Sequence, residues 1–247
     1  MLLFMELSIV IPAFNEEKRL PPTLDRVITY LSVHHNGGYE IIVVNDGSQD
    51  KTAEMVESYR NICAQIKLLS FNKNRGYGAA VREGCLFAKG DFVLAMDADG
   101  SVHEEAIIRF LKYLKSNPEI SMAVGSRTVE GAKIVTPQPW LRVFLGNMFL
   151  LTARILFAWP MEDRINGFKM FRKDAIKDVF LRQFEDGVLG AAEIVYVLER
   201  RGWKYDLLPV LWTDYRDSKI NPLRESYRSL IGMIKIILRD RRGTYTT

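Results

Sequence analysis

Strand-like apolar runs alternate with helix-like segments through the first half of this 247-residue chain. The runs cover residues 7–14, 40–46, 66–71, 91–97 and 122–125. Between them, residues 17–31 and 104–115 place apolar side chains at the three- and four-residue spacing of an amphipathic helix. Strands that are apolar on both faces and alternate with helices form a mostly parallel sheet with helices on both faces. The sequence therefore predicts an α/β, Rossmann-like fold.

Polar residues follow each of these predicted strands. They occupy residues 12–17, 45–50, 72–78, 97–101 and 126–127. In parallel α/β sheets, ligands bind beyond the carboxyl ends of the strands, so these segments should share one rim. That rim is the predicted functional site.

The second half of the chain is less regular. Residues 141–159 are very apolar, but Arg142 and Arg154 bound an uncharged stretch that is too short to span a bilayer. Residues 162–174 read as a polar loop with aromatics, and residues 207–212 read as a late strand. A helix that begins at Pro222 is predicted over 221–242. Its shared apolar face comprises Leu223, Tyr227, Leu230, Ile231, Ile234, Ile237 and Leu238, and its basic flank comprises Arg224, Arg228, Lys235 and Arg239.

Composition excludes several classes of protein. The chain is 48% hydrophobic and 26% charged, as expected for a globular protein rather than a disordered one. A net charge of +4 is too small to indicate nucleic acid binding. The two cysteines lack the spacing of a zinc site or a disulfide framework, and no transmembrane helix is predicted.

Asp97 and Asp99 leave the end of a predicted strand two residues apart. Two ionised carboxylates this close repel one another, and one takes up a proton unless a cation lies beside them. Mg²⁺ typically binds one or two protein carboxylates together with substrate phosphates. The local chemistry therefore indicates a divalent metal that holds a phosphorylated ligand.

Three other interpretations of this acidic pair compete with a metal site. A calcium-binding helix-loop-helix is excluded, because Val102 and Ile108 occupy the positions that need glycine and glutamate. A haloacid-dehalogenase-type phosphatase would use Asp97 as nucleophile, but a later strand should then end in an acidic pair, and residues 207–212 are followed by one aspartate. The third interpretation is that both acids, with Ser101, only cap the following helix.

Two further rim segments were considered as nucleotide-binding elements. Asp46 ends the second predicted strand, where an acid commonly meets a ribose or a base edge, although the same residues could form a simple turn. Residues 76–81 superficially resemble a dinucleotide fingerprint. Val81 occupies the third glycine position, so this match is rejected.

A family resemblance brings these motifs together. The chain contains, in order, SIVIPAFNEEKRLPPTL, EIIVVNDGSQDKT, NRGYGAAVREG and LAMDADGSV, followed by VGSR, DRINGFKMF and DSKI. In this order and over nearly the whole chain, the sequence resembles family 2 glycosyltransferases with the GT-A fold. The subgroup it most resembles is the dolichyl-phosphate glucosyltransferases. In that subgroup, the later helix usually carries a Trp and an Asp-Val-Glu. This chain has Phe184 and Ala-Ala-Glu there, so Glu193 alone matches.

The resemblance implies roles for individual residues. Those expected to bind the nucleotide-sugar are Pro12, Ala13, Asn15, Glu16, Asp46, Arg75, Gly76, Asp97, Ala98 and Asp99. Asp97 and Asp99 would hold Mg²⁺ or Mn²⁺, and Asp163 would lie at the reaction centre as a positioning residue or weak base. The residues expected to bind the acceptor phosphate are Arg127, Arg142, Lys169 and Lys219.

The implied reaction transfers glucose from UDP-glucose to dolichyl or polyprenyl phosphate with inversion. Use of GDP-mannose, and a non-catalytic membrane-peripheral nucleotide-binding protein, are the alternatives. A catalytic domain is predicted over 1–215, with a nucleotide-sugar half near 1–127 and an acceptor half near 128–215. The tail, 216–247, is expected to lie in the membrane interface as an amphipathic helix. The protein is thus expected at the cytoplasmic face of a membrane, and its oligomeric state is left open.

Overall fold

The computed structural model describes residues 5–136, 143–144, 148, 150–151, 154, 163–215 and 222–246, with the backbone alone at 164 and 222–225. Two predicted acceptor-binding residues, Arg142 and Lys219, lie outside the described residues, as does most of the apolar segment 141–159.

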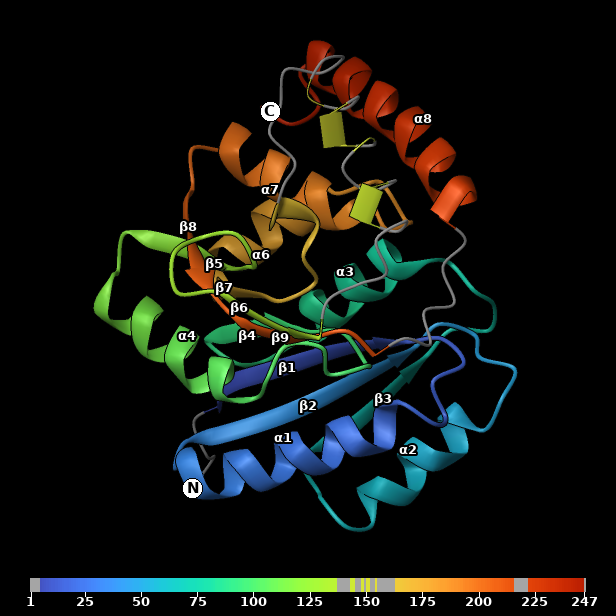
Figure 1. Cartoon of the computed structure of the whole chain (residues 1–247), viewed down its shortest axis with the longest axis vertical. Helices are drawn as coiled ribbons and strands as arrows, with labels where there is room; N and C mark the ends of the chain where they lie inside the picture. Colours follow the sequence, from blue (N-terminus) through green and yellow to red (C-terminus); the bar gives the residue numbers. More distant parts are fainter. Residues whose placement is uncertain are drawn as a thin grey trace.

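A seven-stranded sheet forms the centre of the molecule (Figure 1). Its strands are β1 (Met5–Ala13), β2 (Gly38–Asn45), β3 (Ile66–Ser70), β4 (Phe92–Ala95), β5 (Ile120–Ser126), β7 (Lys169–Arg172) and β8 (Lys204–Pro209), in the order β3-β2-β1-β4-β7-β5-β8. The β1–β2, β1–β4, β2–β3 and β5–β8 pairs are parallel. The predicted mostly parallel α/β fold is confirmed. Strands from both predicted halves of the catalytic domain share this sheet.

The prediction of a polar loop over 162–174 was wrong. This region contains a short 3₁₀ helix, η1 (Asp163–Ile165), and then β7, which is antiparallel to both β4 and β5. Met170 and Phe171 are fully buried between these neighbours. The backbone of β7 finds partners on both sides, so a four-residue segment with flanking charges forms an interior strand.

Helices cover both faces of the sheet. On one face lie α1 (Leu20–His34), α2 (Thr52–Arg60) and α4 (Glu105–Ser116), and on the other lie α3 (Tyr77–Phe87), α6 (Lys173–Phe180) and α7 (Gly190–Arg200). The first face includes an edge-on contact between Phe110 and Phe168, whose ring centroids are 5.0 Å apart. Because each helix buries one stripe, the sheet is enclosed and its strand ends form the accessible rim.

The predicted strand 207–212 is divided between two sheets. Its first part belongs to β8, and its last part forms β9 (Leu211–Thr213), which pairs in parallel with β6 (Lys133–Thr136). Val102, just after the acidic segment, forms a bridge with Trp212 of β9. This small second sheet closes one side of the rim.

Helix α8 (Pro222–Arg241) packs outside α7 (Figure 1). Among its described side chains, the buried hydrophobic ones are Met233 and Ile236, and Tyr245 just beyond its end is also buried. The predicted single apolar face was therefore only partly correct, because Met233 and Ile236 lie outside that set, whereas Leu230 of the set does pack inward. Tyr227, Ile231, Ile234 and Leu238 instead form an exposed outer stripe. Within the described part of the chain, no helix is both long and apolar enough to cross a membrane.

Candidate functional site

The ends of β1 and β2 lie side by side at the rim, since Ala13 pairs with Asn45 in the sheet. Beyond these strand ends, Asn15 joins the loop that follows β1 to the loop that follows β2 through two hydrogen bonds. Its backbone N–H donates to Ser48 Oγ at 2.9 Å, and its Oδ1 accepts from the backbone N–H of Gln49 at 2.8 Å. Asn15 has a φ of +56°, a left-handed conformation that asparagine tolerates better than most residues. Pro12, Ala13 and Glu16 are buried beside it.

Asp46 organises the loop that follows β3. Its carboxylate is almost fully buried and accepts hydrogen bonds from the backbone N–H groups of Arg75, at 2.6 Å, and Gly76, at 2.8 Å. The side-chain amide of Asn74 donates to it at 3.0 Å. Loss of hydration raises the pKa of Asp46, while the two backbone donors oppose that rise. In this structure the Asp46 carboxylate therefore holds the 74–76 loop in place.

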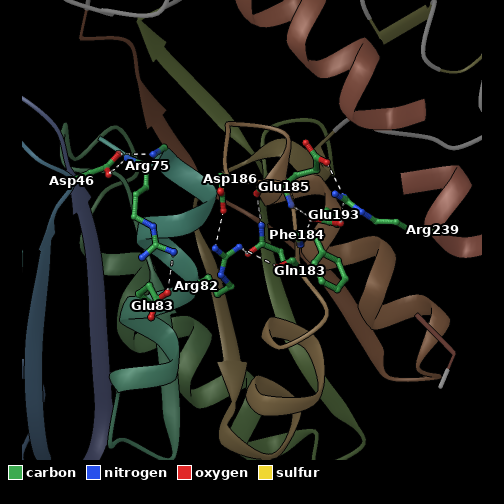
Figure 2. A network of polar contacts seen from close by, with 11 residues as sticks. Asp46, Arg75, Arg82, Glu83, Gln183, Phe184, Glu185, Asp186, Glu193 and Arg239 are labelled. Atoms are coloured by element: carbon green, nitrogen blue, oxygen red, sulfur yellow. Dashed lines mark hydrogen bonds and ion pairs between the residues drawn. The ribbon is translucent and has the colours of Figure 1, made fainter. Parts of the chain in front are cut away.

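The Arg75 side chain turns back toward α3 (Figure 2). Its guanidinium lies 3.2 Å from the Glu83 carboxylate and 4.6 Å from the centroid of the Phe71 ring. Gly76 has a φ of +110°, and a side chain at this position would collide with the backbone carbonyl of Asp186. Residue 76 must therefore be glycine for the loop to approach segment 183–187.

Asp97 and Asp99 are both half-buried at the end of β4. Tyr77 donates to Asp97 Oδ1 at 3.0 Å. Ser101 donates to Asp99 Oδ1 through its backbone N–H at 3.0 Å and its hydroxyl at 2.7 Å. Loss of hydration, followed by the charge of Asp99, raises the pKa of Asp97 to about 6. The two carboxylates thus repel one another at neutral pH, as the sequence predicts.

The donor set fits a hard divalent cation. Among the described residues, no cluster of three or more His, Cys, Asp or Glu side chains is placed to hold a metal. Two carboxylates completed by phosphate and water are the usual ligands of Mg²⁺ in phosphate-binding sites. Gly167 keeps the space beside Asp97 open, because a Cβ there would lie 2.3 Å from Asp97 Oδ1. The carboxylate pair and this open space together fit a metal that also binds a ligand's phosphates.

Two basic residues, Lys169 and Arg127, lie near enough to Asp97 to act on its charge. Lys169 at the start of β7 is almost fully buried, and loss of hydration lowers its pKa to about 7 although Asp97 opposes that shift. Its ammonium donates to the backbone carbonyl of Asn166. The Arg127 guanidinium lies 5.1 Å from the centroid of the Trp212 ring. Both cations lower the pKa of Asp97, so both act on the electrostatics of this site.

Asp163 makes structural hydrogen bonds to residues 126–128. Its carboxylate is 6% exposed and accepts hydrogen bonds from the hydroxyls of Ser126 and Thr128. The backbone N–H of Arg127 donates to it at 2.9 Å. Asp163 therefore joins η1 to the end of β5 and holds the backbone from which the Arg127 side chain extends.

Three residues of this site were missed in the sequence analysis. Tyr77 supports Asp97, Gly167 leaves room beside it, and Arg19 places Nη1 at 3.9 Å from Asp99 Oδ2 while it pairs with Glu16. The glycine pattern around Tyr77 was available as a signal but was considered only as a dinucleotide fingerprint. The contacts of Arg19 and Gly167 join distant segments, and no local pattern indicates them.

Comparisons with known proteins point to one family. The chain matches Glycosyl transferase family 2 over residues 8–180. Dolichyl-phosphate beta-glucosyltransferase ALG5C of Trichomonas vaginalis is 36% identical to it, over 97% of this chain and 73% of that protein. The human dolichyl-phosphate beta-glucosyltransferase is 29% identical, over 88% of this chain and 70% of its own length.

The fold also matches a solved enzyme. The structure of glucosyl-3-phosphoglycerate synthase from Mycobacterium tuberculosis, in complex with Mn²⁺, UDP-glucose and phosphoglyceric acid, superposes with a TM-score of 0.64. The match covers 93% of this chain and 78% of that one, at 17% identity. This likeness supports the GT-A fold predicted for the chain.

Proposed function

The chain belongs to glycosyl transferase family 2, and from this premise we propose that it transfers glucose from UDP-glucose to dolichyl or polyprenyl phosphate with inversion. The observation that carries this choice is the identity of 29–36% with proteins named dolichyl-phosphate beta-glucosyltransferase, over most of the chain. The carboxylate pair at the rim supports a diphosphate-linked donor, because such a donor needs a cation.

Asp97 and Asp99 are the proposed metal ligands for the donor diphosphate, and Ala98 lies between them. Bound Mg²⁺ or Mn²⁺ would neutralise the charge that develops on the departing UDP. Tyr77 holds one carboxylate and Ser101 the other, so both oxygen pairs are oriented before the donor arrives. The proposed donor pocket also includes Pro12, Ala13, Asn15 and Glu16 of the first loop, with Asp46, Arg75 and Gly76 of the second.

The acceptor needs little activation by the protein. The second pKa of a phosphate monoester is about 6, so its oxygen is mostly ionised at neutral pH. That oxygen attacks the anomeric carbon of glucose while the bond from this carbon to UDP breaks, so one displacement inverts the centre. Lys169 and Arg127 are proposed to reduce the repulsion between acceptor phosphate and donor diphosphate. Arg142 and Lys219 remain predicted acceptor ligands outside the described residues.

Asp163 is proposed to act as a positioning residue rather than as a base. Both of its carboxylate oxygens accept hydrogen bonds from residues 126–128, as expected for a residue that orients this backbone. An ionised acceptor phosphate does not require a base. Through this contact, Asp163 would hold the backbone of Arg127 in the orientation that the acceptor requires.

The outer face of α8 is proposed to rest on a membrane that holds the lipid acceptor. Tyr227 and Ile234 are 68% and 52% exposed, and Ile231 and Leu238 continue the same stripe. Lys235 is exposed beside it. An apolar stripe next to basic side chains is typical of helices that lie in an anionic membrane interface. We propose that the protein works at the cytoplasmic face of a membrane as a peripheral protein.

The enzymatic proposal is tested by a donor screen. The protein is incubated with a short polyprenyl phosphate, Mn²⁺ or Mg²⁺, and labelled UDP-glucose or GDP-mannose. We expect the label from UDP-glucose in the lipid-extractable product, and loss of this transfer in Asp99→Ala. Transfer from GDP-mannose alone would overturn the donor, and tight vesicle binding without any transfer would favour a non-catalytic protein.

The membrane proposal has its own test. Ile234→Glu should weaken co-sedimentation with anionic polyprenyl-phosphate vesicles and lower transfer to the lipid acceptor. Ile62→Glu is the matched control, because Ile62 is an equally apolar and 78% exposed residue on the α2 side of the molecule. Equal vesicle binding by both variants and the wild type would contradict a role for α8.

A further inference from the structure

A series of hydrogen bonds and ion pairs connects α8 with α3, the helix that follows the rim loop at 74–76 (Figure 2). Its central part is residues 183–187, here called the strut, which precede α7. One end of the strut is held by α7, α8 and the residues just after α8, and the other end meets the first turn of α3. None of the roles assigned above accounts for these contacts.

Glu193 on α7 holds the first end. Its side chain has no exposed surface, yet it carries a carboxylate. Oε2 accepts from the backbone N–H groups of Phe184, at 2.8 Å, and Glu185, at 2.6 Å. Oε1 accepts from the Tyr245 hydroxyl at 2.5 Å. Burying a carboxylate is costly unless its oxygens are paired, and here the pairing fixes the strut backbone.

Arg239 on α8 makes further contacts with the same end of the strut. Its guanidinium donates to the Glu185 carboxylate at 2.7 Å and lies 3.5 Å from that of Glu193. It also covers the Phe184 ring, 5.0 Å from the centroid. One arginine therefore contacts two consecutive strut side chains and the buried acid that binds their backbone.

The far end of the strut contacts the start of α3. The backbone N–H of Gly78 donates to the carbonyl of Gly187, and that of Ala79 donates to the carbonyl of Asp186, each at 3.2 Å. Arg82 on α3 reaches the Asp186 carboxylate at 2.7 Å and also donates to the backbone carbonyl of Gln183 at 3.0 Å, so it contacts both ends of the strut. Gly76, whose N–H binds Asp46, lies so close that a Cβ would be 2.4 Å from the Asp186 carbonyl oxygen.

From this path we infer that Glu193 and Arg239 are positioning residues for the donor nucleotide, which they influence through the strut, the first turn of α3 and the loop at 74–76. The inference rests on the proposed function, since that function makes the loop part of the donor pocket. Neither residue touches the rim itself. Helix α8, which bears Arg239, also carries the proposed membrane face. The strut therefore connects that face with the donor loop.

A merely structural role would give a different result from a positioning role. Arg239 is partly exposed, and without it Glu193 still accepts hydrogen bonds from Tyr245 and from the backbone N–H groups of Phe184 and Glu185. Loss of Arg239 should therefore leave the fold in place while the strut and the 74–76 loop become less well held. The expected signature is a higher KM for the donor with little change in kcat or in the KM for the acceptor.

The test uses the full chain and Arg239→Met, a change that keeps the packing volume and removes both ion pairs. We expect the KM for UDP-glucose and the Kd for UDP with Mn²⁺ to rise about three- to tenfold, the scale of coupling within one polar network. Arg239→Lys should recover part of this loss, because lysine keeps the charge but not the planar fork. Arg241→Met is the matched control, as Arg241 is exposed at the end of the same helix.

A double-mutant cycle checks the path itself. Arg82→Met removes the contacts of α3 with Gln183 and Asp186 of the strut, and the combined variant with Arg239→Met should lose less UDP affinity than the sum of the two. Additive losses, or an Arg239→Met variant that binds UDP like the wild type, would overturn this inference alone. Failure of the wild type to bind UDP would overturn the proposed function as well.

Discussion

Replacing Asp97 with asparagine should stabilise the metal-free protein and at the same time abolish transfer. The pKa of Asp97 is about 6 in the folded protein, against about 3.9 for an aspartate in an unfolded chain. At pH 4 to 6 the folded state therefore binds a proton that the unfolded state has released. The free energy of unfolding must fall as pH rises through this window.

The size of this effect follows from the shift. About two pKa units at 1.36 kcal/mol each give nearly 3 kcal/mol of destabilisation above pH 6. Asparagine removes the cost of burying a charged carboxylate, and its side-chain oxygen can still accept the hydrogen bond from Tyr77. It also removes the attraction between Asp97 and Lys169. We expect a net gain of about 1–2 kcal/mol at pH 7.5.

Chemical denaturation in EDTA at pH 5 and pH 7.5 measures this gain. Wild type should lose stability between these two pH values, and Asp97→Asn should lose much less. Added Mn²⁺ should raise the melting temperature of the wild type but not of the variant. Asp91→Asn, at the opposite end of β4, is the matched control and should change stability by less than about 0.5 kcal/mol.

Two results would refute the reasoning. If Asp97→Asn destabilised the metal-free protein, the carboxylate would be stabilised by its surroundings rather than strained by them. If the variant kept the thermal shift with Mn²⁺ and the transfer activity, Asp97 would not be a metal ligand.

Three further predictions concern the same site. Gly167→Ala should lower activity at least tenfold and weaken the Mn²⁺-induced thermal shift, because its Cβ would collide with Asp97; unchanged metal binding would contradict this. Asp163→Asn should lower the free energy of unfolding by about 1–3 kcal/mol, because one carboxylate oxygen that accepts hydroxyl bonds becomes a donor; full stability with no activity would instead identify a base. Lys169→Met should lower kcat/KM about a hundredfold for the lipid acceptor, with little change in UDP binding measured by calorimetry.

Much of the donor side was accessible from sequence. Strands with both faces buried produce continuous apolar runs, and their carboxyl ends must meet at one rim, so Asp46 and Asp97 could be placed there in advance. The role of Asp46 was harder to foresee. Two of its three donors are backbone N–H groups 29 and 30 residues away, and a backbone group carries no residue type for a pattern to recognise.

The acceptor side depended more on tertiary contacts. Residues 169–172 form an interior strand only because β4 and β5 offer them partners on both sides. The outward face of α8 was ambiguous for a related reason. Apolar residues occur around most of this helix, and helical periodicity alone cannot say which of them meet α7.

By itself, the sequence determined the α/β class, the rim of polar segments and the carboxylate pair, because each follows from the local spacing of residues and from covalent order. Only the tertiary structure decided that Asp163 is held by residues 126–128, that Gly167 leaves Asp97 accessible and that Glu193 is buried under α8. These contacts join segments separated by up to 70 residues. Their geometry is set by how the packed layers meet, and no short stretch of sequence encodes it.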